Sequence, residues 1–263
     1  MSPHEVIESR VLGAFRLIEN PTQAVVKRPL NVSAANSAFI RNRSYHYVIS
    51  NAAGLTHHTE AFSEPPELPP LETVDIDINV HDPMHRYLPR ITTVSLPRDP
   101  DPEHAGQANS LFRAIPVQMY AAPTFSMHPN WSGIRTSLSI AGSPDEPVPG
   151  ALLRVIRSSD DVVLARGYSD PRGEALVIIP GIPITNFSSS SDDEDDSDAS
   201  GTVTISETAV RVEVIADAAL PWPVDPDLLE ANRASLIREG DEPLLLTLHT
   251  GQIKTLSIEV DLT

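Results

Sequence analysis

The chain has 263 residues, a formal net charge of −17 and no cysteine. This length is sufficient for two domains of ordinary size. Without cysteine there are no disulfides, thiolate nucleophiles or thiolate metal sites, which fits a reducing compartment. The acidic balance argues against binding to nucleic acid or to an anionic membrane surface, because no basic patch in the sequence offsets it.

Proline is the residue that departs most from average usage. The chain has 25 prolines, nearly twice the share of roughly 5% that is usual. Because proline is excluded from helix interiors and central strands, this content favours many short strands over helices. The N-terminus shows no basic region followed by an apolar run, and no stretch reaches the ~18 apolar residues of a membrane span. We therefore expect a cytoplasmic protein without membrane insertion.

The first half of the chain carries short runs that are typical of strands. The clearest is 74–80, VDIDINV, in which apolar and polar residues alternate so that one face would be buried. A proline-rich stretch before it, SEPPELPP at 63–70, predicts an extended spacer. The expected strands of this half are 12–17, 24–32, 45–50, 74–80, 87–96 and 115–120.

The second half begins near Trp131, after a predicted hinge at 126–130. Seven runs at regular spacing predict a β-sandwich, and 226–238 is the one stretch with a helical pattern. The acidic run SSSSDDEDDSDAS at 188–200 predicts a disordered insertion between two strands, because it has almost no apolar side chain to bury. The expected strands are 134–140, 151–157, 162–166, 174–179, 210–215, 244–249 and 254–260.

These patterns together predict an all-β fold of two consecutive β-sandwich-like domains. The N-terminal β domain is expected at 1–125, and the second sandwich, with one short helix, at 131–263. Within the second, Asp170-Pro171-Arg172-Gly173 has the residues of a type I turn. Proline presets the backbone of the second position, and the aspartate can accept a hydrogen bond from the backbone that follows.

The turn lies in a longer motif, G-A-L-L-R-V at 150–155 followed by L-A-R-G-Y-S-D-P-R-G-E-A-L-V at 164–177. This motif resembles a carboxypeptidase-regulatory-like, or transthyretin-like, β-sandwich domain over about residues 131 to 263. The resemblance implies an Ig-like sandwich that serves as an accessory interaction module. It does not imply peptidase activity, because nothing in this chain matches the zinc ligands of a true carboxypeptidase.

Three segments of the first half, 25–30, 42–49 and 86–90, resemble bacterial proteins in which a β domain precedes such a sandwich. Proteins of this kind occur with phage-tail-like contractile injection systems. The resemblance implies a cap or terminal adaptor component that contacts tube, sheath or cap proteins. It also implies a homo-oligomeric ring, with a hexamer as the expected order.

The sequence contains one cluster of residues that could react or bind a metal. His81, Asp82 and His85 could contribute to a metal site or a hydrolase centre, but Pro83 argues against a helix that would bring the two histidines together. No nucleophile elbow, dinucleotide fingerprint or phosphate-binding loop is present. We therefore expect no catalytic residue, no cofactor, no metal and a non-enzymatic protein; an enzyme based on this cluster is the alternative.

Two groups of residues are candidates for partner contacts. Tyrosine and arginine are favoured at interfaces, which points to Arg86, Tyr87 and Arg90. The alternative is an ordinary strand whose arginines pair with acids of the same chain. The acidic run could attract a basic partner surface or be only a solvated loop. Its candidate residues are Asp192, Asp193, Glu194, Asp195 and Asp196.

The alternative function is a carbohydrate- or cell-surface-binding β-sandwich module. Such a site needs exposed aromatic side chains, and aromatic residues make up only 5% of the chain. Trp131 and Trp222 are the candidates, but prolines near both favour packing at a domain edge. The leading hypothesis is thus a structural adaptor that acts through protein–protein contacts.

Overall fold

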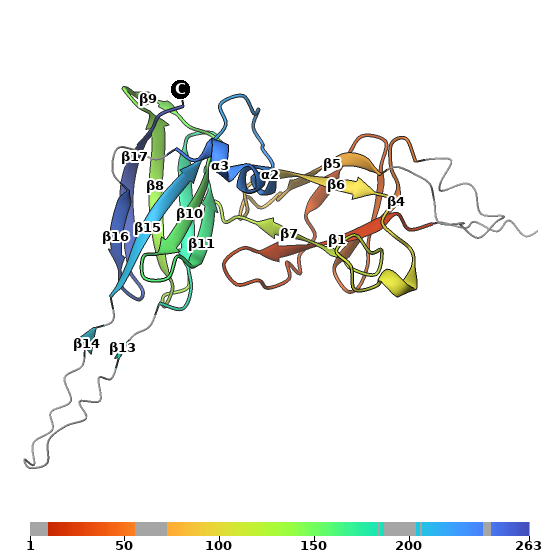
Figure 1. Ribbon diagram of the computed structural model, residues 1–263, viewed down its shortest axis with the longest axis horizontal. Coiled ribbons are helices and arrows are strands. Elements are labelled where there is room, and N and C mark those ends of the chain that lie inside the picture. Colours follow the sequence, from red (N-terminus) through yellow and green to blue (C-terminus); the bar gives the residue numbers. More distant parts are fainter. Residues whose placement is uncertain are drawn as a thin grey trace, which may run out of the picture. The chain divides into compact units, whose positions relative to one another are not determined.

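A computed structural model describes residues 10–55, 73–182, 185–186, 204–205, 207–238 and 243–262. The chain divides into unit 1, Met1–Tyr120 with Pro223–Asp227, and unit 2, Ala121–Trp222 with Leu228–Thr263. The described residues form many strands, two short α-helices and one 3-10 turn (Figure 1). The predicted all-β fold is confirmed. The segment Pro223–Asp227 belongs to unit 1, although it lies within the sequence range predicted for the second sandwich.

Unit 1 contains two sheets. In the first, of order β3-β4-β1-β7, β1 is antiparallel to β4 and parallel to β7. The second, of order β2-β5-β6, is antiparallel, and in β5 the side chains of Ile76, Ile78 and Val80 are buried, as the alternating pattern predicts. The elements are β1 (Gly13–Glu19), β2 (Asn31–Ser33), β3 (Ala38–Arg41), β4 (His46–Asn51), β5 (Val74–His81), β6 (Arg90–Leu96), η1 (Pro102–His104) and β7 (Ile115–Met119).

Unit 2 is a sandwich of two larger sheets. One has the order β11-β10-β15-β16 and is antiparallel; the other has the order β12-β8-β17, with β17 parallel to β8. Its strands are β8 (Ser132–Ile140), β9 (Ser143–Pro147), β10 (Leu152–Arg157), β11 (Val163–Tyr168), β12 (Glu174–Ile179), β13 (Thr185–Asn186), β14 (Thr204–Ile205), β15 (Thr208–Ile215), β16 (Leu244–Leu248) and β17 (Ile253–Val260). Its helical segments are α2 (Pro226–Ala231), which starts in the part assigned to unit 1, and α3 (Arg233–Leu236).

The core of unit 2 lies between these two sheets. Side chains from β8 and β12 pack there with side chains from β10 and β15, and each strand contributes alternate residues. Burial of this apolar surface is the main favourable contribution to folding. Fully or almost fully buried members include Ile134, Leu138, Leu153, Val155, Val177, Val210 and Val260.

The predicted turn at Asp170 connects the two sheets at one side of the sandwich. The Gly173 N–H donates to the Asp170 carbonyl at 2.9 Å, and the Asp170 carboxylate accepts from the N–H groups of Arg172 and Glu174 at 2.8 and 3.0 Å. Ser169 and Ala175 then form a bridge across the corner. On this side the chain runs directly from β11 in one sheet into β12 in the other.

Several predicted boundaries differ from the structure. The strand expected at 87–96 begins only at Arg90, because Pro89 has no N–H to donate and the Tyr87 N–H donates instead to Asp82. Only the end of the strand expected at 24–32 is formed, as β2. The helix expected at 226–238 is broken at Asn232 into α2 and α3, and Ile237 forms an extended bridge with Ile215. The short strands β3 and β9 were not predicted.

Candidate functional site

The segment Arg86–Arg90, predicted as a partner contact, is only partly on the surface. The Tyr87 side chain is 5% exposed; its hydroxyl donates to Glu19 and the Arg28 guanidinium lies 5.1 Å from its ring centroid. Burial and the Glu19 hydrogen bond raise the pKa of Tyr87 far above its usual range. Arg90 is 1% exposed, whereas Arg86 is exposed. Tyr87 and Arg90 therefore stabilise unit 1 from within, and Arg86 is the exposed residue of the three.

Arg90 holds the segment Pro223–Asp227 against β6. Its guanidinium donates to Asp225 at 2.9 Å, to Asp227 at 2.6 Å and to the Gln118 carbonyl at 2.8 Å. The backbone of the same segment continues this contact, since the Ile91 N–H donates to the Val224 carbonyl at 3.1 Å. The arginine thus pairs with acids of its own chain, as the alternative reading of this strand predicted.

Asp82 is the centre of a turn. Its carboxylate pairs with Arg28 and accepts from the N–H groups of Met84, Arg86 and Tyr87 at 3.0, 2.8 and 3.0 Å. Burial raises the pKa of Asp82, but the three N–H groups and the Arg28 charge outweigh it and lower the pKa below its ordinary value. The rings of His81 and His85 lie 5.6 Å apart. Among the described residues, no group of three or more His, Cys, Asp or Glu is arranged to hold a metal ion.

The remaining candidates fall into two sets. Asp192, Asp193, Glu194, Asp195 and Asp196 lie outside the described residues. Trp222 stacks on the buried ring of Tyr168 with centroids 5.0 Å apart, and Trp131 packs against a small cluster that contains Leu176 and Ile178. Both tryptophans are half-buried in packing contacts, which leaves neither as the open aromatic platform that a sugar site requires.

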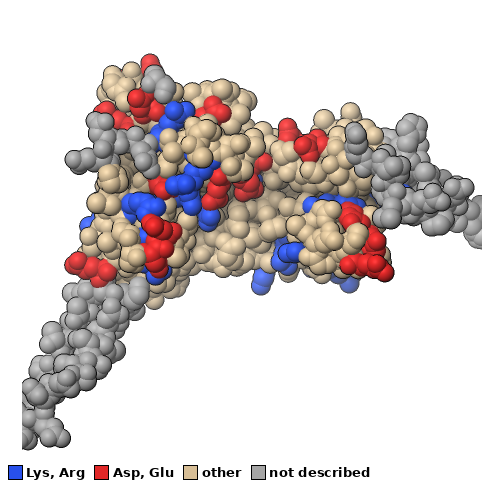
Figure 2. Space-filling model, viewed as in Figure 1, with Lys and Arg blue, Asp and Glu red and all other residues tan. Residues whose placement is uncertain are grey.

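An ion-pair cluster not foreseen from the sequence covers the outer face of the β11-β10-β15-β16 sheet. Glu213, only 3% exposed, accepts from Arg154 at 2.9 Å and from Arg233 at 2.6 and 2.9 Å, and Arg211 lies 3.5 Å away. Beside it, Arg166 donates through two nitrogens to Glu230 at 2.7 to 2.9 Å. Figure 2 shows the acidic and basic side chains interspersed on this face of unit 2.

This Glu213 cluster attaches the helical segments to the sheet. Burial raises the pKa of Glu213, but hydrogen bonds from Arg233 and the charges of Arg233, Arg154 and Arg211 outweigh it and lower the pKa below its ordinary value. The carboxylate is therefore held in its ionised form, and its oxygens accept hydrogen bonds from the arginines around it. This arrangement positions α3 against the sheet.

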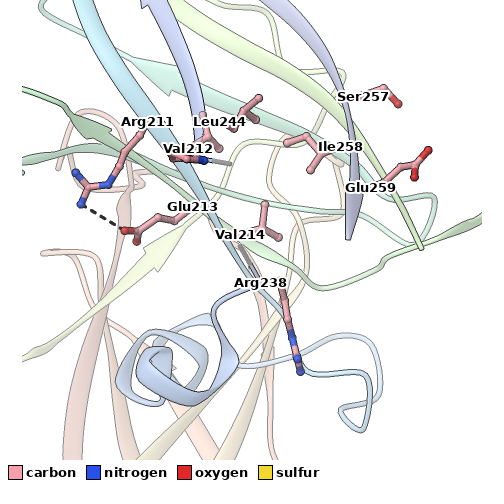
Figure 3. Close-up of a pocket in the computed structure, with 10 residues that line it drawn as sticks. Arg211, Val212, Glu213, Val214, Arg238, Leu244, Ser257, Ile258 and Glu259 are labelled. Carbon is pink, nitrogen blue, oxygen red and sulfur yellow. Dashed lines mark ion pairs between the residues drawn. The ribbon is translucent and has the colours of Figure 1, made fainter. Parts of the chain in front are cut away.

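On the opposite side of the sandwich, from here on the open side, the chain crosses from β16 into β17 through residues 249–252, and no other described strand pairs with the outer edge of either. There β16 and β17 form the outer strands of their two sheets, and a hollow of about 220 Å³ lies beside them. Figure 3 shows Leu244 and Ile258 on the side of β15 away from Arg211 and Glu213. The apolar lining residues of this hollow are Val212, Val214, Pro243, Leu244 and Ile258, and the polar ones include Arg238, Ser257 and Glu259.

The open side is the candidate interaction site of the protein. Leu244, Leu246, Leu256 and Ile258 pack on the sandwich core but remain only partly buried. On β16 the side chain of Leu245 is 63% exposed, and on β17 that of Ile253 is 45% exposed. Incompletely covered apolar side chains next to two outer strands are typical of surfaces that bind another chain.

The sequence contained part of the signal for this site. The run 253–260, IKTLSIEV, alternates in the way that predicts a strand with one buried face. Nothing in that run shows whether the strand is central or outermost in its sheet, because strand order depends on the long-range pairing of β17 with β8.

No protein-family model matches the chain, and no curated protein matches it in sequence. Among solved structures, it is similar to the Bacillus anthracis TIE protein, with a TM-score of 0.29 and 7% identity over 97% of this chain and 34% of that chain. The chain thus spans about a third of the length of that structure, and a similarity this low carries no argument about function. No helix in the described residues is long and apolar enough to cross a membrane.

Proposed function

We propose that this protein is a non-catalytic structural adaptor that binds other protein subunits through the open side of the unit 2 sandwich. The observation that carries the proposal is the outer edge of β17, which pairs with no other strand in the described residues and lies beside an apolar hollow. A free sheet edge offers a row of backbone donors and acceptors, and proteins use such edges to bind extended segments of other chains. The adjoining hollow supplies apolar surface that such a segment would bury.

The charged groups support a structural role. Asp82, Glu213 and Arg90 are the most deeply buried charged side chains of their clusters, and each is held by several hydrogen bonds from its own unit. Buried charges satisfied in this way stabilise a defined fold and are poorly placed to react with a substrate. The arrangement favours binding over catalysis as the activity of the protein.

The more specific assignment rests on the sequence motifs. Residues 149–181 resemble a carboxypeptidase-regulatory-like domain. The first half resembles bacterial proteins in which a β domain precedes such a sandwich and which occur with phage-tail-like contractile injection systems. These two resemblances support a cap or terminal adaptor in such a particle. In this role the protein would act in the cytoplasm, contact tube, sheath or cap proteins, and assemble as a ring, with a hexamer as the expected order.

The test is to follow a tagged chain in cells that produce tail-like particles. We expect the tagged protein to sediment with the particles and to locate at one end of them by immunogold labelling. Native mass spectrometry of the purified protein would show whether it forms a ring by itself. A chain that stays in the soluble fraction and is absent from purified particles would refute the particle assignment.

A further inference from the structure

The backbone of β17 determines which groups face the open side. The Gly133 N–H donates to the Gln252 carbonyl at 3.0 Å, and the Ala141 N–H donates to the Val260 carbonyl at 2.9 Å. Since successive residues of a strand direct their backbone groups to opposite sides, the even-numbered residues of β17 face β8. The N–H and C=O groups of Ile253, Thr255, Ser257 and Glu259 therefore face away from β8, where none of the strands in the described ranges pairs with them.

The outer strands β6 and β17 differ in whether another segment of the chain covers their outer edge. In unit 1 the outer strand β6 is covered by the chain itself, because the N–H groups of Ile91 and Thr93 donate to Val224 and Asp225. In contrast, β17 pairs with β8 over eight residues without proline and without a register shift. Regular outer strands of this kind are usually protected by a bulge, a proline or a covering segment. A regular outer strand that no other described segment covers indicates that it pairs with another chain.

The side chains of β17 determine which residue types a pairing strand needs at each position. Leu256 and Ile258 are half-buried and face the core, and Ile258 lines the hollow. Lys254 is half-buried in the same alternating row, and Glu259 is exposed in the other row. A complementary strand would place apolar residues opposite Leu256 and Ile258, and opposite charges next to Lys254 and Glu259.

A second copy of β17 does not meet this requirement. When two identical antiparallel strands pair about a two-fold axis, residues from the same face lie opposite each other, so odd numbers pair with odd and even with even. Lys254 and Glu259 are on different faces, and symmetric pairing can never bring them together. The charges therefore select a strand of different sequence.

We propose that β17 binds an extended strand of another protein subunit by β-augmentation. For an antiparallel strand the pattern is basic, apolar, any, apolar, any, acidic, with the basic residue opposite Glu259 and the acidic residue opposite Lys254. The apolar residues extend the core into the hollow at Leu244 and Ile258. This inference rests on the proposed function, because it identifies the class of segment that the adaptor receives.

The first experiment measures binding of synthetic peptides to the full chain. One fluorescent peptide contains Lys-Ile-Thr-Val-Thr-Glu, and a second exchanges its two charged residues. We expect the first to bind by fluorescence anisotropy and to slow amide hydrogen exchange at Thr255 and Ser257. Exchanging the charges turns two attractive pairs into repulsive ones and should weaken binding about tenfold. Equal binding of both peptides, or no binding, would overturn the proposal.

The second experiment removes one backbone donor. Ser257→Pro deletes an N–H that faces away from β8, a position where proline is tolerated in an outer strand. We expect peptide affinity to fall at least about tenfold, whereas the control Ser257→Ala, which keeps the N–H, should bind normally. Thermal unfolding of both variants reports whether the sandwich is intact. If Ser257→Pro does not fold, Lys254→Glu provides the test, because it should weaken the first peptide and favour one with basic residues at both ends.

The outcomes separate this inference from the proposed function. Particle association that survives Ser257→Pro would retain the adaptor and refute the β17 contact. If the wild-type protein is absent from the particles but binds the peptide as expected, the particle assignment is refuted. The inference that β17 binds an extended strand is then retained. If native mass spectrometry showed a dimer that forms through β17, the inference that the partner strand differs in sequence from β17 would be wrong.

Discussion

The guanidinium of Arg90 lies 2.9 Å from the carboxylate of Asp225, 135 residues later in the chain, and both side chains are buried. This pair explains why Pro223–Asp227 belongs to unit 1 while the residues on either side of it belong to unit 2. Asp225 also accepts from the Thr93 N–H at 2.9 Å, so one carboxylate satisfies both a buried charge and a backbone donor. The position of this segment depends on that carboxylate.

Arg90→Ala should strongly destabilise unit 1. The substitution leaves Asp225 as a buried carboxylate without its charge partner, a change that costs about 3–5 kcal/mol. Urea unfolding followed by fluorescence would measure the loss. As a control, Arg157→Ala removes an exposed pair with Asp160 and should cost at most about 1 kcal/mol. Similar losses for the two variants would contradict a structural role for Arg90.

Stability should fall as the solution becomes acidic. The pKa values of Asp82 and Glu213 are lowered in the fold from ordinary values of 3.8 and 4.5. Their contribution is therefore complete above the ordinary values and is lost as the pH falls through the lowered ones. Urea unfolding of the wild type should show this decline below about pH 4.5, and Glu213→Gln should show a smaller decline. An unchanged slope in the variant would contradict the role assigned to Glu213.

Gly173→Ala should destabilise the corner between β11 and β12. Gly173 has φ +74°, and a Cβ there would clash with the Leu138 carbonyl oxygen. Gly181 is the matched control, because it has φ +79° but nothing within 4 Å of an added Cβ. We expect Gly181→Ala to cost about 1–2 kcal/mol from its backbone conformation alone, and Gly173→Ala roughly twice that or more. Thermal unfolding would rank the two, and equal losses would argue against close packing at this turn.

His104 should titrate above its usual range. Its Nδ1 lies 2.7 Å from the Asp99 carboxylate, and this hydrogen bond raises the pKa of His104 above its ordinary value of 6.5. NMR titration of the ring protons would measure it. Asp99→Asn should lower the pKa, and Asp101→Asn should lower it less, because the Asp101 carboxylate is 3.9 Å away. A larger effect from Asp101→Asn would be inconsistent with this geometry.

Local pattern predicted most of the strands correctly and failed where side chains compete with the sheet. In β5 Ile76, Ile78 and Val80 are buried, as the run 74–80 predicts, whereas Val74 at its start is exposed. At 87–89 the same pattern predicted a strand, but the Tyr87 N–H donates to the Asp82 carboxylate, and Pro89 has no N–H that could pair with another strand. The prediction of Arg86, Tyr87 and Arg90 as one contact set rested on residue types that are frequent at interfaces. It could not show that the partners of Arg90 are Asp225 and Asp227 of the same chain.

The sequence by itself determined that this protein is built from short strands. Alternation with period two, prolines between the runs and the turn at Asp170 are local properties, and local backbone geometry follows from them. The tertiary structure alone decided which strands are outermost, that Asp225 reaches Arg90, and that four arginines gather around two glutamates. These features join residues far apart in the chain, and their distances are set by how the sheets pack. The exposure of β17, on which the proposed activity depends, is a property of this packing.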